Sequence, residues 1–160
     1  MSERLYDRSS RTIAVSDIRP DVLATIEAHT AERLLEPVAE TALACVATHS
    51  VSLRKPSFLA RLGGRKSEAE HHTFAVLTPT TLIAATTGDQ RGTTVLSTRL
   101  ADVDLIEQTN PAYAIDSSIH VRGRWGGSEA SSYVVALGDD PAGQGFHAAL
   151  RTAVAAVKRS

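Results

Sequence analysis

The stretch DDPAGQGFHAALRTAVAAVKRS, residues 139–160, predicts an amphipathic helix near the end of the chain. The acidic pair followed by Pro141 is typical of a helix start, because acidic groups and proline suit the first turn. Lys158 and Arg159 lie at the other end, where the helix dipole favours cations. The apolar residues recur with helical spacing and form one face: Phe146, Ala149, Leu150, Ala153, Val154 and Val157. We expect this face to pack against whatever precedes it.

The residues before this helix predict strands with short connections. The sequence HTFAVLTPTTLIAATTG (72–88) indicates two strands around a turn at Pro79–Thr80, and SSIHVRGRW (117–125) alternates apolar and polar residues strictly. The other candidate strands are residues 42–53, 93–100, 102–108 and 131–137, which makes seven in all. Short connections favour antiparallel neighbours. The fold class is therefore α+β and mainly β, with the terminal helix closing the open end of a twisted sheet.

The N-terminal residues differ in character from the strands. Residues 1–18 are polar and aperiodic, so we expect a flexible or loosely docked arm. Residues 19–38 follow a helical stripe from Pro20 to Pro37, as one helix or as two short ones broken near His29 and Thr30. Residues 39–160 then form the main domain.

The bulk composition excludes several classes of protein. The chain has 160 residues, 42% hydrophobic and 22% charged, with a net charge of −1. A near-neutral chain argues against a dedicated nucleic-acid binder. There is one cysteine, no apolar run of the roughly 20 residues that span a bilayer, and no signal-like N-terminus. We expect a cytoplasmic protein, and the richness in alanine and arginine is typical of a GC-rich bacterial genome.

Four stretches carry a resemblance to a known family: FAVLTPTTLIAATTG, TTVLSTRLADVDLIEQ, SIHVRGRWGGSEASSYVVAL and GFHAALRTAVAAVKRS. Over about residues 40–160 the chain resembles the bacterial pleckstrin-homology-like domain family. The resemblance implies a seven-stranded antiparallel, partly open barrel or sandwich of two sheets, capped by the C-terminal helix. It also implies a binding module rather than an enzyme, without a cofactor. The helical segment 19–38 would be an addition to that domain.

The stretch SLRKPSFLARLGGRK (52–66) is the main candidate site. It gathers cations and apolar residues between the first two predicted strands: Arg54, Lys55, Phe58, Leu59, Arg61, Leu62, Arg65 and Lys66. Lipid-binding members of the family hold phosphoinositide headgroups with a basic loop at this connection. Each cation near an anionic bilayer contributes at most about 1 kcal/mol, so the loop allows only weak, salt-sensitive membrane binding.

Three readings of the chain stay open. The first is a non-catalytic module that binds a protein partner or a second copy of itself. The second is peripheral binding to anionic membrane lipid through residues 54–66, and the third is a small-ligand carrier or enzyme with a pocket in the barrel. The basic stretch could equally be a solvated loop.

The remaining candidates favour structural roles. His120, Arg122 and Arg124 share one strand face, which is a secondary anion or partner face or else a solvated outer surface. His71 and His72 point to opposite faces of a strand, with His49 a candidate cross-strand neighbour, so we expect no metal site there. Cys45 lies in an apolar strand and is interpreted as a core residue. No nucleophile elbow, phosphate loop or paired histidine–glutamate motif occurs, so we expect no enzyme.

Overall fold

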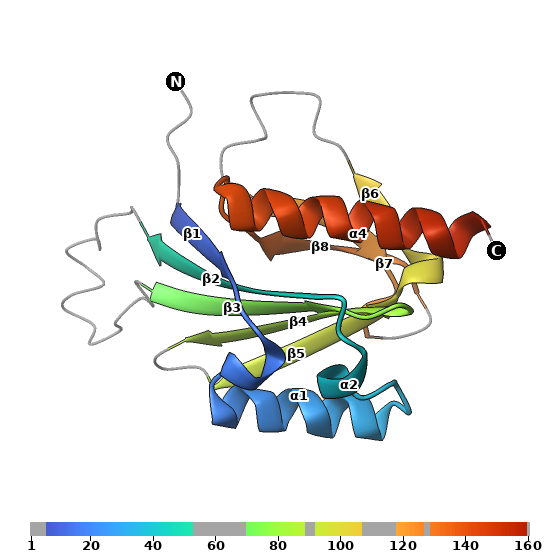
Figure 1. Cartoon of the computed structure of the whole chain (residues 1–160), viewed down its shortest axis with the longest axis horizontal. Coiled ribbons are helices and arrows are strands. Elements are labelled where there is room, and N and C mark those ends of the chain that lie inside the picture. Colours follow the sequence, from blue (N-terminus) through green and yellow to red (C-terminus); the bar gives the residue numbers. More distant parts are fainter. Residues whose placement is uncertain (1–5, 53–69, 89–91, 107–117, 127–128, 160) are drawn as a thin grey trace.

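A computed structural model describes residues 6–52, 70–88, 92–106, 118–126 and 129–159. Its strands form two antiparallel sheets (Figure 1). The first sheet contains, in spatial order, β1 (Tyr6–Thr12), β2 (Ala44–Ser52), β3 (Glu70–Leu77), β4 (Thr81–Gly88) and β5 (Thr93–Arg99). The second contains β6 (Asp104–Ile106), β7 (Ser118–Gly123) and β8 (Ser131–Ala136). The helices are α1 (Pro20–Glu32), α2 (Val38–Thr41) and α4 (Pro141–Arg159), with 3-10 turns η1 (Val15–Asp17) and η2 (Leu100–Asp102).

The five-stranded sheet forms the middle layer of the molecule. Helices α1 and α2 cover one of its faces, and the three-stranded sheet together with α4 covers the other (Figure 1). Alternate residues of β4 divide accordingly, because Ile83 packs towards α1 while Leu82 packs towards α4. Burial on both sides explains why residues 74–77 of β3 and 82–85 of β4 are continuous apolar runs instead of alternating.

The structure confirms a mainly β fold with antiparallel sheets and a C-terminal helix, and it corrects the strand count. The seven expected strands correspond to β2 through β8, and β1 is an eighth. The described strands form two separate sheets and no closed barrel.

The expected N-terminal arm is also corrected, since residues 6–12 form β1 and pair with β2 over their whole length. The sequence YDRSSRT hides this strand because it has no apolar alternation. An edge strand of this kind is held by backbone hydrogen bonds and by polar contacts, which leave no hydrophobic signature.

The sequence left open one helix over residues 19–38 or two helices broken near His29 and Thr30. Helix α1 continues through both residues and ends at Glu32 with Arg33 as its C-cap, and Pro37 precedes the short α2. Leu34 has a φ of 57°, the left-handed conformation that usually ends a helix with glycine. The helix packs directly on the sheet, because Val22 and Ile26 are buried against its outer face, and Ile18, just before the helix, is buried with them.

The C-terminal helix forms as expected, and its apolar face joins the core between the sheets. Its start is fixed by Asp140, whose carboxylate accepts hydrogen bonds from the backbone N–H of Gly143 (3.0 Å) and of Ser10 (2.7 Å). The hydroxyl of Ser10 in turn accepts a hydrogen bond from the N–H of Gly138 (2.8 Å). These bonds tie β1 to the start of α4. Within the described residues, no helix has the length and apolar character needed to cross a membrane.

Candidate functional site

The outer face of the three-stranded sheet carries two exposed aliphatic side chains, Ile106 and Val134. Strand register places Ile106, His120 and Val134 in one row across the sheet and Asp104, Arg122 and Ser132 in the next. We call these six residues the open face. Ile106 and Val134 are 40% and 46% exposed, whereas Ile119, Val121 and Val135 on the opposite side of the same strands are buried. The alternation predicted for β7 is thus confirmed, with His120 and Arg122 on its outer side.

The charges on the open face are unevenly engaged. Lys158 at the end of α4 donates a hydrogen bond to the carboxylate of Asp104 (2.8 Å), and this bond lowers the pKa of that carboxyl group. Asp104 is therefore already matched by a cation of the same chain. Arg122 lies beside it with its guanidinium group exposed, so the face offers a cation, a histidine and two aliphatic side chains to a ligand.

Arg124 does not join the open face, although the sequence placed it with His120 and Arg122. It follows the end of β7, and its backbone N–H donates a hydrogen bond to the hydroxyl of Thr98 on β5 (3.0 Å). Gly123 permits this approach, because a Cβ atom there would lie 2.5 Å from the same hydroxyl. Arg124 instead lines a pocket of about 320 Å³ together with Arg33 and Arg99.

The basic stretch falls outside the described residues, so the structure does not place Arg54, Lys55, Phe58, Leu59, Arg61, Leu62, Arg65 or Lys66. Its two ends are placed, at Ser52 on β2 and Glu70 on β3. Close to them, the guanidinium of Arg8 lies over the ring of Tyr6 at 4.8 Å, and that ring meets His71 edge-on at 5.3 Å. One cation and one histidine thus flank this end of the sheet.

Histidines occupy the opposite face of the same strands. His49 and His72 are cross-strand partners whose rings stack at 4.7 Å, while His71 points the other way, as predicted. His49 also bonds the carboxylate of Glu70 (3.2 Å). The stacked pair lines a pocket of about 540 Å³ to which Arg11, Asp17 and Arg19 contribute charged groups and Ala47 and Phe74 apolar surface. In the described part of the chain, no group of three or more histidine, cysteine, aspartate or glutamate side chains is arranged to hold a metal ion.

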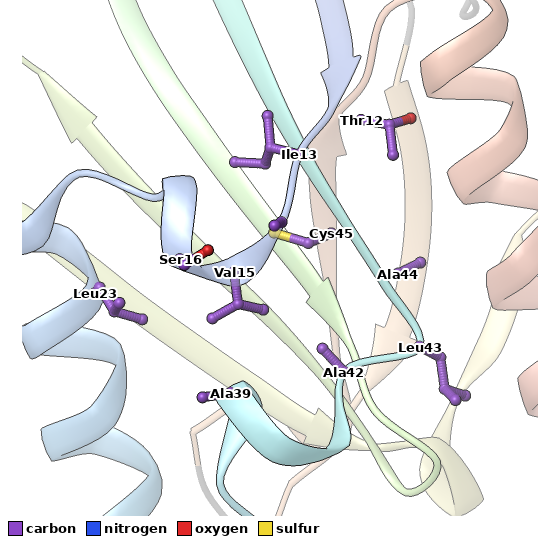
Figure 2. Close-up of a pocket in the computed structure, with 11 residues that line it drawn as sticks. Thr12, Ile13, Val15, Ser16, Leu23, Ala39, Ala42, Leu43, Ala44 and Cys45 are labelled. Atoms are coloured by element: carbon purple, nitrogen blue, oxygen red, sulfur yellow. The ribbon is translucent and has the colours of Figure 1, made fainter.

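An apolar pocket of about 490 Å³ lies between η1, α1, α2 and the start of β2 (Figure 2). Ile13, Val15 and Leu43 line it, and Cys45 is the sulfur-bearing residue among them. Burial raises the pKa of the Cys45 thiol to about 12, so the group stays protonated at neutral pH. A protonated, buried thiol is a poor nucleophile. The interpretation of Cys45 as a core residue is confirmed.

The space between the two sheets is occupied by side chains. Leu82 from one sheet, Val121 from the other and Leu150 from α4 are each fully buried in one core cluster. The three pockets described above are lined largely from the outer face and the edges of the five-stranded sheet. The third reading placed a ligand pocket inside a barrel. In the described residues, core side chains occupy that position.

Comparisons with protein-family models, with curated proteins and with solved structures give no match for this chain. The fold and the surfaces above therefore carry the functional argument.

Sequence reasoning named Arg124, but it missed Arg33 and Arg99, which come from distant parts of the chain. Arg33 caps the end of α1, Arg99 ends β5, and Arg124 follows β7. No local spacing connects them. Only the packing of α1 on the five-stranded sheet and the approach of residues 123–124 to Thr98 on β5 bring them to one pocket.

Proposed function

We propose that the chain is a non-catalytic binding module of the pleckstrin-homology-like kind, and that its open face binds a partner protein. The observation that carries the proposal is the exposure of Ile106 and Val134 on a sheet face. The five-stranded sheet has helices on one face and a second layer on the other. The three-stranded sheet keeps Ile106 and Val134 partly in solvent on either side of His120, and this exposed aliphatic surface is the one that we assign to the partner.

The chemistry of the open face defines the partner. Protein interfaces combine an apolar centre with polar groups at the rim, and arginine is enriched in them. Here Ile106 and Val134 flank His120, and Arg122 lies in the adjoining row. Asp104 forms an ion pair with Lys158 and also lies in the field of Arg122, which is the arginine among the six residues of the open face. We therefore propose a partner surface that is apolar at its centre and acidic at its edge.

The test compares variants that differ only in where they place a charge. Val134→Glu changes the open face, and Ala148→Glu changes an exposed position on α4. Proteins captured from native cells by wild type and by Ala148→Glu are then purified, and their affinities for wild type and for each variant are measured by calorimetry. We expect Val134→Glu and Arg122→Glu each to weaken binding by about tenfold or more.

Two outcomes of that test would count against a separate partner. If wild type forms a dimer in light scattering that Val134→Glu dissociates, the open face binds a second copy of this chain. If calorimetry finds equal affinity for all variants, the open face is not the binding surface.

A second candidate function is peripheral binding to anionic lipid. Its support is the cationic end of the five-stranded sheet, where Arg8 stacks on Tyr6 beside the ends of the segment carrying residues 54–66. Basic side chains next to an anionic bilayer attract it in a salt-dependent manner. Both this candidate and the first belong to the pleckstrin-homology-like resemblance.

Co-sedimentation with phosphatidylglycerol-rich vesicles tests this candidate. We expect binding at low salt that is lost at high salt and in a variant with Arg61, Arg65 and Lys66 changed to glutamate. Arg151→Glu, an exposed change of the same sign on α4, is the control. Absence of binding at low salt, or binding that the triple variant retains, would remove lipid as the ligand.

A further inference from the structure

Three arginines line one pocket at the end of the five-stranded sheet that lies opposite Ser52 and Glu70. The pocket has a volume of about 320 Å³ and lies where the end of β5 meets the start of β4, because Arg99 and Thr81 are cross-strand partners there. Arg33 comes from the end of α1 and Arg124 from the residue after β7. Ser52 ends β2 and Glu70 begins β3, on either side of the basic stretch in the sequence. Both residues lie at the end of the sheet that is away from this pocket.

The three guanidinium groups are not matched by carboxylates. Within the described residues, none of Arg33, Arg99 and Arg124 has a carboxylate oxygen within 4.0 Å, whereas Arg19 and Lys158 each do. Asp102 is the one acidic residue that lines the pocket, which leaves two positive charges in excess. Cations gathered from three separate elements repel one another, and a bound anion would remove that cost.

A structural explanation exists for only one of the three. Arg33 is the C-terminal cap of α1, where the helix dipole attracts a cation whether or not a ligand is present. Arg99 ends a strand and Arg124 follows one, so the dipole accounts for neither.

The base of the pocket is built from fixed hydroxyl groups. Thr81, Ser97 and Thr98 are buried. The hydroxyl of Ser97 bonds Nε2 of His29 (2.7 Å), and the hydroxyl of Thr98 holds the backbone of Arg124. The arginine side chains, by contrast, are exposed above this base. The elements that carry the cations are therefore held in place while the guanidinium groups stay accessible.

We propose that this arginine pocket binds a phosphoryl group, as the free ion or as a phosphate monoester. Guanidinium groups donate paired hydrogen bonds that match phosphate oxygens, and two excess charges match a phosphate dianion. The volume is at the lower end of ligand pockets, which favours a compact anion over a nucleotide or a cofactor. The site is independent of the open face, so this inference does not rest on the proposed partner.

Titration of the purified chain with inorganic phosphate and with phosphoserine tests the proposal, with chloride and serine at matched ionic strength as references. The readout is the fluorescence of Trp125, which is the only tryptophan and follows Arg124 directly, together with calorimetry. We expect saturable binding that Arg99→Gln and Arg124→Gln each weaken by about tenfold. Arg151→Gln, on the exposed side of α4, should leave the affinity unchanged.

The variant Asp102→Asn should change the phosphate affinity in the direction opposite to that of the arginine variants. Removing this negative charge should tighten phosphate binding, whereas a loss of folding would weaken it. Binding of phosphoserine without binding of inorganic phosphate would support the proposal and identify a monoester as the ligand. No saturable binding of either probe at millimolar concentration, or equal affinity in Arg99→Gln, Arg124→Gln and Arg151→Gln, would overturn it.

Discussion

Replacing Gly143 by alanine should destabilise the protein, whereas the same replacement at Gly145, two residues along the same helix, should stabilise it. A Cβ atom at Gly143 would lie 1.9 Å from the carbonyl oxygen of Gly138 and 2.8 Å from its carbonyl carbon. The obstacle is backbone, so no side-chain rotation relieves it. A Cβ atom at Gly145 meets nothing within 4 Å.

The size of the effect follows from what the clash must displace. Moving residues 138–140 away from α4 would disturb the bonds from Gly143 and Ser10 to Asp140 and from Gly138 to Ser10. Each such hydrogen bond contributes about 0.5–1.5 kcal/mol. Alanine recovers about 0.5–1 kcal/mol of helix propensity at either site. We expect Gly143→Ala to lower the free energy of unfolding by about 2–3 kcal/mol and Gly145→Ala to raise it by up to about 1 kcal/mol.

Urea and thermal unfolding measure both variants. Far-ultraviolet circular dichroism follows the helices, and the fluorescence of the buried Trp125 follows the core. For a chain of this length, 1 kcal/mol corresponds to about 2–4 °C in Tm, so the two variants should differ by roughly 4–16 °C. Equal stability of Gly143→Ala and Gly145→Ala would refute the close packing of residue 138 against the first turn of α4.

Three further changes test other parts of the fold. Leu34→Gly should raise the free energy of unfolding by about 1 kcal/mol in urea titrations, because glycine adopts the φ of 57° without strain; a loss of stability would contradict this. Glu36→Gln should lower the free energy of unfolding by about 1 kcal/mol at neutral pH, since the carboxylate accepts one hydrogen bond from the hydroxyl of Thr78 and one from that of Thr80. These bonds lower the pKa of Glu36, so wild-type stability should fall as pH drops below 4.5, less steeply in the variant; equal slopes would refute the assignment. Burial, aided by the charge of Arg33, lowers the pKa of His29 below 6.5. The neutral imidazole therefore adds its full share to the free energy of unfolding above pH 6.5, and this share is lost as the pH falls through the lowered pKa of the folded protein. Chemical unfolding between neutral and mildly acidic pH should therefore show a loss in wild type that His29→Gln reduces, and an unchanged profile would contradict it.

The sequence predicted those elements whose apolar residues repeat with a clear period. Helix α4 has one apolar face in six residues, and β7 alternates without exception, so both were recognised where they lie. Strand β1 was missed because its contacts are backbone bonds and the hydroxyl of Ser10, which pairs with Thr48 at 2.6 Å. Periodicity reports burial, and an edge strand made of polar residues has little of it.

The candidate surfaces were predictable in part for the same reason. His120 and Arg122 lie on the face that alternation assigned to them, because two residues two apart in a strand share a side. Arg124 continues the same alternation but leaves the strand, since Gly123 lets the backbone approach Thr98. The exposure of Ile106 and Val134 depends on which elements cover which sheet. That arrangement is a tertiary property that no local pattern contains.

Photo-crosslinking at Val134 tests the central claim most directly. A photoreactive amino acid is placed at Val134 on the open face, and in a second variant at Ala148 on the exposed side of α4. In the native cell, we predict one defined crosslinked protein from Val134 that is lost when Arg122→Glu is added, and none from Ala148. The same products from both positions, or none from Val134, would contradict the assignment of the open face as a binding surface.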